Sequence, residues 1–146
     1  MKKVDDLRGI KTAITDNKRF IKKHKIELLV VIGSFGTDKF LHGESDIDIA
    51  FLTEVPIKED QMLGFLNELS SIIKYSKLDL IDLHYASGLL KFEVATKGRL
   101  LYEKTQGLLE RYRLYCYRYY YDTKKFRVMR QEYFENKLGE LMNGQG

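Results

Sequence analysis

Two aspartates separated by one residue, Asp46 and Asp48, are the residues of this sequence best placed to do chemistry. They alternate with apolar residues in a pattern of period two, which predicts a β-strand over 47–51. In a strand this spacing places both carboxylates on one face, where two neighbouring anions repel each other. A divalent cation would relieve the repulsion, and Mg²⁺ prefers carboxylates together with substrate phosphates as ligands. The pair therefore indicates metal-assisted chemistry on a phosphate compound.

The dipeptide Gly33-Ser34 is the second chemical feature, and it follows an apolar run over 27–32 that is typical of a buried strand. We expect a helix to begin after it, so that backbone N–H groups at the helix N-terminus can bind a phosphate. Glycine allows close approach and the serine hydroxyl adds a donor. Alone, each feature has an ordinary explanation, as a turn or as a solvated strand edge. Together, separated by a spacer over 35–45, they match what metal-assisted phosphoryl or nucleotidyl transfer requires.

A third carboxylate is available on the next apolar segment, residues 78–83, which reads L-D-L-I-D-L and predicts another strand. Its two aspartates, Asp79 and Asp82, are three residues apart. They must therefore point to opposite faces, and only one of them can join Asp46 and Asp48.

The elements that must position these residues follow from hydrophobic periodicity, which predicts an α/β chain. Helices are expected over 4–24, 57–75 and 86–96, and a last strand over 100–102. From residue 108 onward the spacing is again helical, with Asp122-Thr123 expected to cap a break between two helices.

Composition limits the class of protein. The chain has 146 residues, which suits one domain, and 44% of them are hydrophobic, enough for a core. A single cysteine, Cys116, excludes an intrachain disulfide framework and a cysteine-rich zinc site. No apolar run approaches the roughly 18 residues of a membrane helix, and the N-terminus does not read as a signal peptide. We therefore expect a cytoplasmic protein without membrane contact.

The net charge of +4 lies entirely in the C-terminal segment. Residues 1–103 hold 16 basic and 16 acidic side chains, whereas residues 104–146 hold 9 basic, 5 acidic and seven of the ten tyrosines. Basic and aromatic side chains together could bind RNA. The helical spacing favours packing against the body, another copy of the chain or a partner protein, and tyrosine and arginine are both enriched in such interfaces.

The order of these motifs resembles the nucleotidyltransferase superfamily that includes DNA polymerase β, and within it the minimal nucleotidyltransferase (MNT) proteins. The resemblance covers residues 25–103 and implies the polymerase beta-like fold, a mixed sheet packed with helices. We accordingly expect a nucleotidyltransferase domain over 1–103 and a C-terminal helical extension over 104–146. The family's third acidic residue lies in an apolar-Asp-apolar-apolar strand, which favours Asp79 over Asp82. The resemblance then implies that Asp46, Asp48 and Asp79 are catalytic and bind two Mg²⁺ ions.

For the nucleotide, the resemblance implies that Ser34 and the backbone at Gly33 hold the terminal phosphates of ATP. We also expect Lys39 and Ser45 to contact the nucleotide. Many family members carry an arginine shortly after Gly-Ser, but residues 35–43 contain none, and Lys39 is their only cation. Lysine lacks the two-pronged geometry of a guanidinium, which implies weak triphosphate affinity or lost activity.

The resemblance implies transfer of a nucleoside monophosphate, AMP from ATP, to the hydroxyl of a protein. It points to the antitoxin of a pair whose toxin is a HEPN-domain protein. Two alternatives stay open at this stage. One is a small-molecule nucleotidyltransferase resembling the aminoglycoside-modifying enzymes, and the other is a non-catalytic antitoxin that binds its toxin by contact alone.

Overall fold

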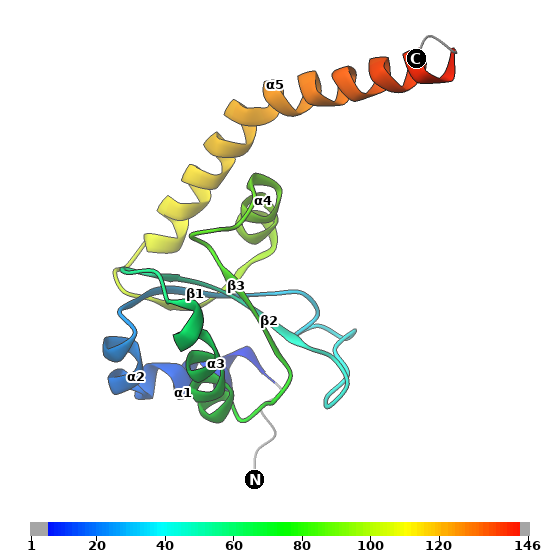
Figure 1. The fold of residues 1–146 in the computed structure, drawn as a ribbon. Coiled ribbons are helices and arrows are strands. Elements are labelled where there is room, and N and C mark those ends of the chain that lie inside the picture. Colours follow the sequence, from blue (N-terminus) through cyan, green and yellow to red (C-terminus); the bar gives the residue numbers. More distant parts are fainter. Residues whose placement is uncertain (1–5, 144–146) are drawn as a thin grey trace.

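A computed structural model describes residues 6–143 of the chain. At its centre lies a four-stranded mixed sheet of order β3-β2-β1-β4 (Figure 1). The strands are β1 (Ile26–Ile32), β2 (Ile47–Thr53), β3 (Leu78–Asp82) and β4 (Arg99–Glu103). β1 pairs antiparallel with both β2 and β4, and β2 pairs in parallel with β3. The four strands expected from apolar periodicity are thus confirmed, each within two residues of its expected ends.

Helices cover both faces of the sheet (Figure 1). On one face α1 (Leu7–Asp16), α2 (Lys18–Lys23) and α3 (Glu59–Ile73) enclose a first core with alternate residues of the strands, including Leu29, Ile49 and Phe51. On the other face α4 (Gly88–Lys97) and the start of α5 (Leu108–Met142) enclose a second core with the intervening residues, including Val30 and Ala50. Strand residues therefore alternate between the two cores, and the parity of a residue, its odd or even place along its strand, assigns its side chain to one face.

The single N-terminal helix expected over 4–24 is wrong, because the chain forms two helices separated at Asn17. Asn17 has φ −98° and ψ 62°, outside the helical region, and its N–H donates to the Ile14 carbonyl at 3.0 Å. The change of direction lets Phe20 stack on Phe65 of α3, with ring centroids 5.5 Å apart. Val4, the first apolar residue of the expected helix, lies outside the described residues.

The break expected at Asp122-Thr123 is also absent, since α5 is one helix over that stretch. The Thr123 hydroxyl donates to the Tyr119 carbonyl one turn earlier, at 2.7 Å, so it satisfies the helix from within. Arg127 donates to the Tyr120 carbonyl at 2.7 Å and to the Thr123 hydroxyl. The Thr123 and Arg127 side chains thus donate to the carbonyls of one turn, Tyr119 and Tyr120. This turn is near the place where α5 changes direction in Figure 1.

The two halves of α5 have different surroundings. The first half packs on α4, where Tyr120 stacks on Phe92 at 4.1 Å and Arg113 donates to the Ala95 and Gly98 carbonyls at the end of α4. From residue 128 to 143 every side chain is exposed, and this part of the helix projects from the body (Figure 1). Within residues 6–143, no helix combines the length and apolar character that a membrane span needs.

Candidate active site

The register of the sheet brings two of the expected carboxylates side by side. In the parallel pairing of β2 with β3, Asp48 lies opposite Asp79, and in the antiparallel pairing with β1 it lies opposite Ile32. Asp46 immediately precedes β2 and has the parity of Asp48. All three side chains therefore start from the face of the sheet that carries α4 and α5, where β1 ends.

The electrostatics of Asp48 show how close these groups are. Its pKa is raised above the usual 3.8, first by burial and then by repulsion from Asp79, Asp46 and Glu93. Glu93 lies on α4, so a fourth carboxylate contributes from the helix above the strands. Without a cation, the folded chain therefore holds an accumulation of negative charge at this point.

Gly33 lies directly against Asp48. Its φ is +81°, a conformation that residues with a Cβ rarely adopt, and a Cβ built there would be 2.5 Å from Asp48 Oδ2. Glycine is thus needed at this position both for its backbone conformation and for the approach of the carboxylate. The close contact joins the Gly33-Ser34 turn and the aspartate pair into one site.

The helix expected to begin after Gly33-Ser34 is wrong. Residues 33–45 form a series of turns, in which the Ser34 carbonyl accepts from the Thr37 N–H at 3.0 Å and from its hydroxyl at 2.5 Å. A second glycine with positive φ, Gly36 at +82°, interrupts any helical continuation. Any phosphate site here is therefore a loop of backbone N–H groups and not a helix N-terminus.

The remaining expected nucleotide contacts have different surroundings. Within the described chain, nothing hydrogen-bonds the half-buried Ser34 hydroxyl, and the Lys39 side chain is exposed. Ser45 is engaged, since its hydroxyl accepts from the Leu41 N–H at 3.0 Å and its carbonyl accepts from the Tyr75 hydroxyl. Tyr75 also accepts from the Gly43 N–H at 3.1 Å, so it fixes the loop that delivers Asp46 to the sheet. The structure therefore gives Ser45 a role in loop closure.

Asp82 lies on the other face of the sheet, opposite Phe51 in the register of β2 and β3. Its Oδ1 accepts from the His84 N–H at 3.0 Å, while Oδ2 is buried without a partner among the described residues. Asp82 is thus a half-buried residue at the end of β3, on the face away from Asp48. Of the two candidates, only Asp79 lies beside Asp48.

Sequence reasoning missed two residues. Glu93 belongs to a helix whose position over the carboxylates depends on packing, and it carries no motif. Arg99 begins β4 and reaches the glycine loop, where its Nη2 donates to the Gly33 carbonyl at 3.1 Å. No local signal could have found Arg99, because its place depends on β4 pairing with β1 across 66 positions of sequence.

The donor set fits Mg²⁺. Among residues 6–143, no three His, Cys, Asp or Glu side chains converge as a complete ligand group. Mg²⁺ does not require one, because it usually binds one or two carboxylates and takes its other ligands from water and substrate phosphates. Paired carboxylates beside a glycine loop, with an Asp48 pKa raised by repulsion, suit a metal that binds together with a nucleotide.

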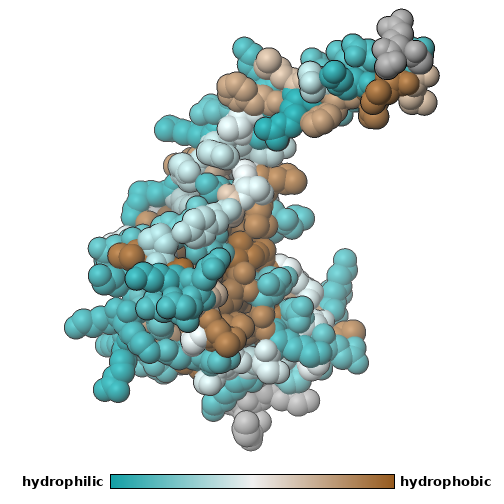
Figure 2. All heavy atoms as spheres, viewed as in Figure 1, coloured by the Kyte–Doolittle hydropathy of each residue, from teal (hydrophilic) through white to brown (hydrophobic). Residues whose placement is uncertain are grey.

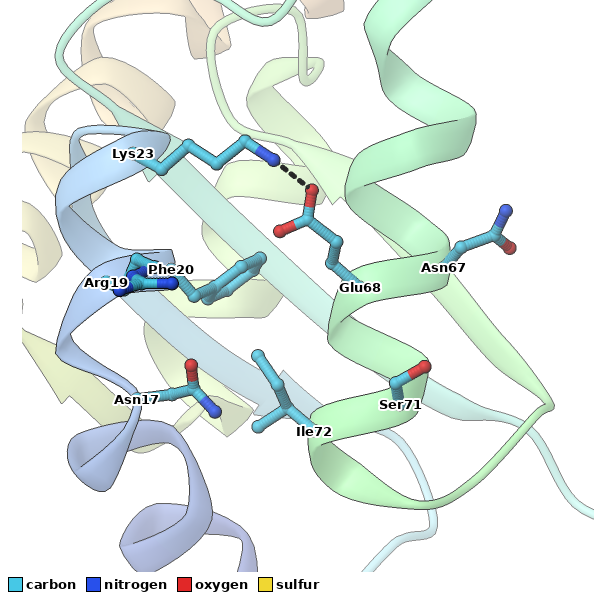
Figure 3. A pocket seen from close by; sticks show the side chains of 8 residues that line it. All are labelled: Asn17, Arg19, Phe20, Lys23, Asn67, Glu68, Ser71 and Ile72. Carbon is cyan, nitrogen blue, oxygen red and sulfur yellow. Dashed lines mark hydrogen bonds and ion pairs between the residues drawn. The ribbon is translucent and has the colours of Figure 1, made fainter.

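A pocket elsewhere in the molecule is separate from this site. Figure 3 shows it between α2 and α3, where Phe20 and Ile72 form its floor and Lys23 donates to Glu68 at 2.6 Å. It lies on the face of the sheet opposite the paired aspartates and contains none of the expected site residues. The expected site residues thus lie outside this hollow.

Solved structures with the same fold come from toxin–antitoxin systems. A chain of a toxin–antitoxin solved with AMP-PNP is 25% identical with a TM-score of 0.65, and the match covers 88% of this chain and 98% of that one. A chain from the tri-AMPylated Shewanella oneidensis HEPN toxin in complex with MNT antitoxin is 22% identical, with a TM-score of 0.60, covering 88% and 98%. A chain from a mutant of the toxin–antitoxin MntA-HpeT is 22% identical, with a TM-score of 0.63, and the match covers 85% of this chain and 97% of that one. At 22% identity the last two show the fold alone.

Among curated proteins, none matches the sequence. The family model described as "Polymerase beta, Nucleotidyltransferase" matches residues 16–107, which span the whole sheet and every expected site residue. The paired carboxylates, the glycine loop against them and this match agree. The chain therefore belongs to the polymerase beta nucleotidyltransferase family.

Proposed function

We propose that this chain transfers AMP from ATP to a hydroxyl of a partner protein, and that it is the antitoxin of a HEPN/MNT toxin–antitoxin pair. One observation supports this most directly. A member of the polymerase beta family with Asp48 and Asp79 side by side is similar over nearly its full length to chains from toxin–antitoxin structures, one of them solved with AMP-PNP. A further similar chain comes from a complex whose HEPN toxin is tri-AMPylated. A cytoplasmic location is part of the proposal, since a single cysteine leaves no intrachain disulfide to form.

In this proposal Asp46, Asp48 and Asp79 hold Mg²⁺ with the nucleotide phosphates. The metal supplies charge neutralisation for the phosphates and for the leaving group. Asp79, at the more exposed edge strand, takes the proton from the acceptor hydroxyl. The acceptor oxygen then bonds to the α-phosphorus, the bond from that phosphorus to the bridging oxygen breaks, and pyrophosphate leaves.

The loop holds the other end of the nucleotide. The Ser34 hydroxyl and the backbone N–H groups beyond Gly33 donate to phosphate oxygens, since nothing else in the described chain hydrogen-bonds that hydroxyl. Gly33 keeps the loop close enough to Asp48 for one triphosphate to contact both.

The projecting part of α5 supplies the surface for the partner. Figure 2 shows hydrophobic atoms among hydrophilic ones along this arm. Its exposed apolar side chains are Val128, Met129, Tyr133, Phe134, Leu138, Leu141 and Met142, and Phe126 just before it is exposed as well. Large exposed apolar side chains of this kind mark interaction sites. The division of the chain at residue 103, with the tail as a binding extension, belongs to this proposal.

RNA binding by the tail is less favoured. The tyrosines nearest the body are already in contact with α4, since Tyr120 stacks on Phe92 and Lys91 lies over the Tyr119 ring at 4.6 Å. Stacked bases would have to displace these contacts.

The test is to incubate the full chain with labelled ATP, Mg²⁺ and the product of a neighbouring HEPN-type gene, and to measure the intact mass of both proteins. We expect the partner to gain one or more AMP masses, and the Asp48→Asn variant to transfer none. A complex that forms without any AMP on the partner would favour the non-catalytic antitoxin. Transfer to an aminoglycoside and not to the partner would favour the small-molecule enzyme.

A further inference from the structure

A nucleoside triphosphate brings more negative charge than the backbone of one loop can balance. The segment after Gly33-Ser34, residues 35–43, contains no arginine, and its one cation, Lys39, has an exposed side chain. Lysine offers a point charge on a flexible stem, whereas a guanidinium can bind two phosphate oxygens at once. The local sequence therefore leaves the terminal phosphates without a well-placed partner.

The structure brings a cation to this loop from a distant part of the chain. Arg99 opens β4, and it lies opposite Val31 of β1, one residue before the position where β1 lies opposite Asp48. Its Nη2 donates to the Gly33 carbonyl at 3.1 Å. Its Nη1 lies 2.7 Å from the position that a Cβ on Gly36 would occupy. The guanidinium is thus packed against both glycines of the turn.

The position of Arg99 is complementary to that of Asp48. Because side chains alternate along a strand, the Arg99 side chain leaves the sheet on the α1–α3 face and the Asp48 side chain leaves it on the α4–α5 face. Both side chains reach the loop that follows β1. Asp48 therefore contacts this loop at Gly33, and the guanidinium contacts it at Gly33 and Gly36.

The guanidinium also has unused donors. Arginine carries five N–H groups in a planar fork, and within residues 6–143 its one hydrogen bond, to the Gly33 carbonyl, uses one of its nitrogens. That bond orients the guanidinium and leaves its other N–H groups able to donate. Because both flanking glycines lack a side chain, nothing from Gly33 or Gly36 shields the guanidinium.

We propose that Arg99 binds the terminal phosphates of the nucleoside triphosphate and so supplies, from β4, the cation that the segment after Gly33-Ser34 lacks. This inference rests on the proposed function, because it assumes that the loop binds a triphosphate. The competing explanation is that Arg99 only braces the loop through the Gly33 carbonyl. The two differ in one respect: a brace supports every nucleotide equally, whereas a phosphate ligand distinguishes nucleotides by their number of phosphates.

The test measures the affinities of the full chain for AMP-PNP, ADP and AMP by calorimetric titration with Mg²⁺. We expect Arg99→Gln to weaken AMP-PNP binding about 10- to 100-fold, the usual effect of losing hydrogen bonds to a charged group, and to leave AMP binding within about 2-fold. Arg99→Lys should restore part of the loss. The matched control is Arg19→Gln on α2, an exposed arginine beside the pocket between α2 and α3, which should bind all three nucleotides as the wild type does.

Three results would overturn the inference. Equal losses for AMP-PNP and AMP in Arg99→Gln would show a brace. Unchanged AMP-PNP affinity in Arg99→Gln, with a loss in Lys39→Gln, would assign the role to Lys39. A wild-type chain that binds none of the three nucleotides would overturn the proposed function as well, so the two failures are distinguishable.

A measurement on the wild-type chain covers the case in which the Arg99 variants do not fold. Phenylglyoxal modifies exposed arginines, and the modified peptides can be quantified by mass spectrometry. We expect AMP-PNP with Mg²⁺ to protect Arg99 at least about 10-fold, AMP to protect it little, and neither to protect Arg19. Modification of Arg99 at the same rate with and without AMP-PNP would contradict the proposal.

Discussion

Replacing Gly33 by alanine tests whether the contact between the loop and the carboxylates matters for chemistry. Gly33 has φ +81°, and Gly43, in the spacer that follows, has φ +85°. A Cβ at either position incurs the strain of a left-handed conformation, about 1–2 kcal/mol. The surroundings differ, because a Cβ on Gly33 would lie 2.5 Å from Asp48 Oδ2, whereas a Cβ on Gly43 would meet nothing within 4 Å. Gly43→Ala is therefore a control that isolates the backbone strain.

The second cost of Gly33→Ala falls on Asp48. Its Oδ2 is the end of a side chain, so it can rotate away from the new methyl group at about 0.5–1.5 kcal/mol. We therefore expect urea unfolding at pH 7 to place the two variants within about 1.5 kcal/mol of each other. Transfer should differ much more, because a misplacement of about 1 Å at a reacting centre costs on the order of 100-fold. Gly33→Ala should lose that much AMP transfer, and Gly43→Ala should stay within about 3-fold of the wild type.

Both measurements can refute this reasoning. If Gly33→Ala transferred AMP at the wild-type rate, the close approach of Gly33 to Asp48 would have no part in catalysis. If Gly43→Ala lost activity equally, backbone strain in the spacer would explain both results, and the specific contact would not be needed.

Four further changes test the rest of the site and the tail. Asp48→Asn should raise the free energy of unfolding at pH 7 by about 1 kcal/mol without metal, the repulsion between charges about 5 Å apart in largely aqueous surroundings. Because the folded chain raises the pKa of Asp48, the contribution of Asp48 to wild-type stability should fall as pH rises above 3.8, and the asparagine variant should lack that contribution to the pH dependence in urea unfolding. Ser34→Ala should weaken ATP binding by about 1–3 kcal/mol in a titration, and an unchanged affinity would leave the turn a structural role only. Truncation after Tyr121 should leave nucleotide binding intact and abolish partner binding in size-exclusion chromatography. Truncation after Gly107 should instead cost about 5 kcal/mol or more, because it removes Leu109, Tyr112 and Cys116 from the second core.

The part of the site that the sequence predicts is the part built from local patterns. Alternation over 47–51 places Asp46 and Asp48 on one face whatever the partner strands are, and the run over 78–83 limits the third carboxylate to two candidates. The family's strand pattern favours Asp79 over Asp82, but from the residues alone the choice needs the register of β3 with β2, which is a property of the sheet. The same holds for Arg99, whose neighbours in space are set by the strand order β3-β2-β1-β4.

The errors have a physical pattern too. The single helix expected through Asn17 is interrupted there, and the helix expected after Gly33 does not form. In both places the backbone leaves the helical region locally, at Asn17 with ψ 62° and at Gly36 with φ +82°. At Asp122-Thr123 the opposite occurs, because the Thr123 side chain bonds to a carbonyl inside the helix instead of capping a new one. Polar residues of this kind can either end a helix or remain within it, and here side-chain bonds inside α5, such as that from Arg127 to the Tyr120 carbonyl, accompany its continuation.

The position of the arm relative to the carboxylates connects binding with chemistry. Asp48 has the parity of Ala50, which packs with Cys116 and Tyr112 of α5 in the second core. The face of the sheet that carries the aspartates is therefore the face from which α5 departs, and the first half of α5 is fixed there by the bonds from Arg113 to the end of α4. A partner bound to the exposed stretch of α5 would be held on the same side of the molecule as Asp79. In the proposed function, the arm would thus supply the affinity for an acceptor protein while the sheet supplies the groups that react.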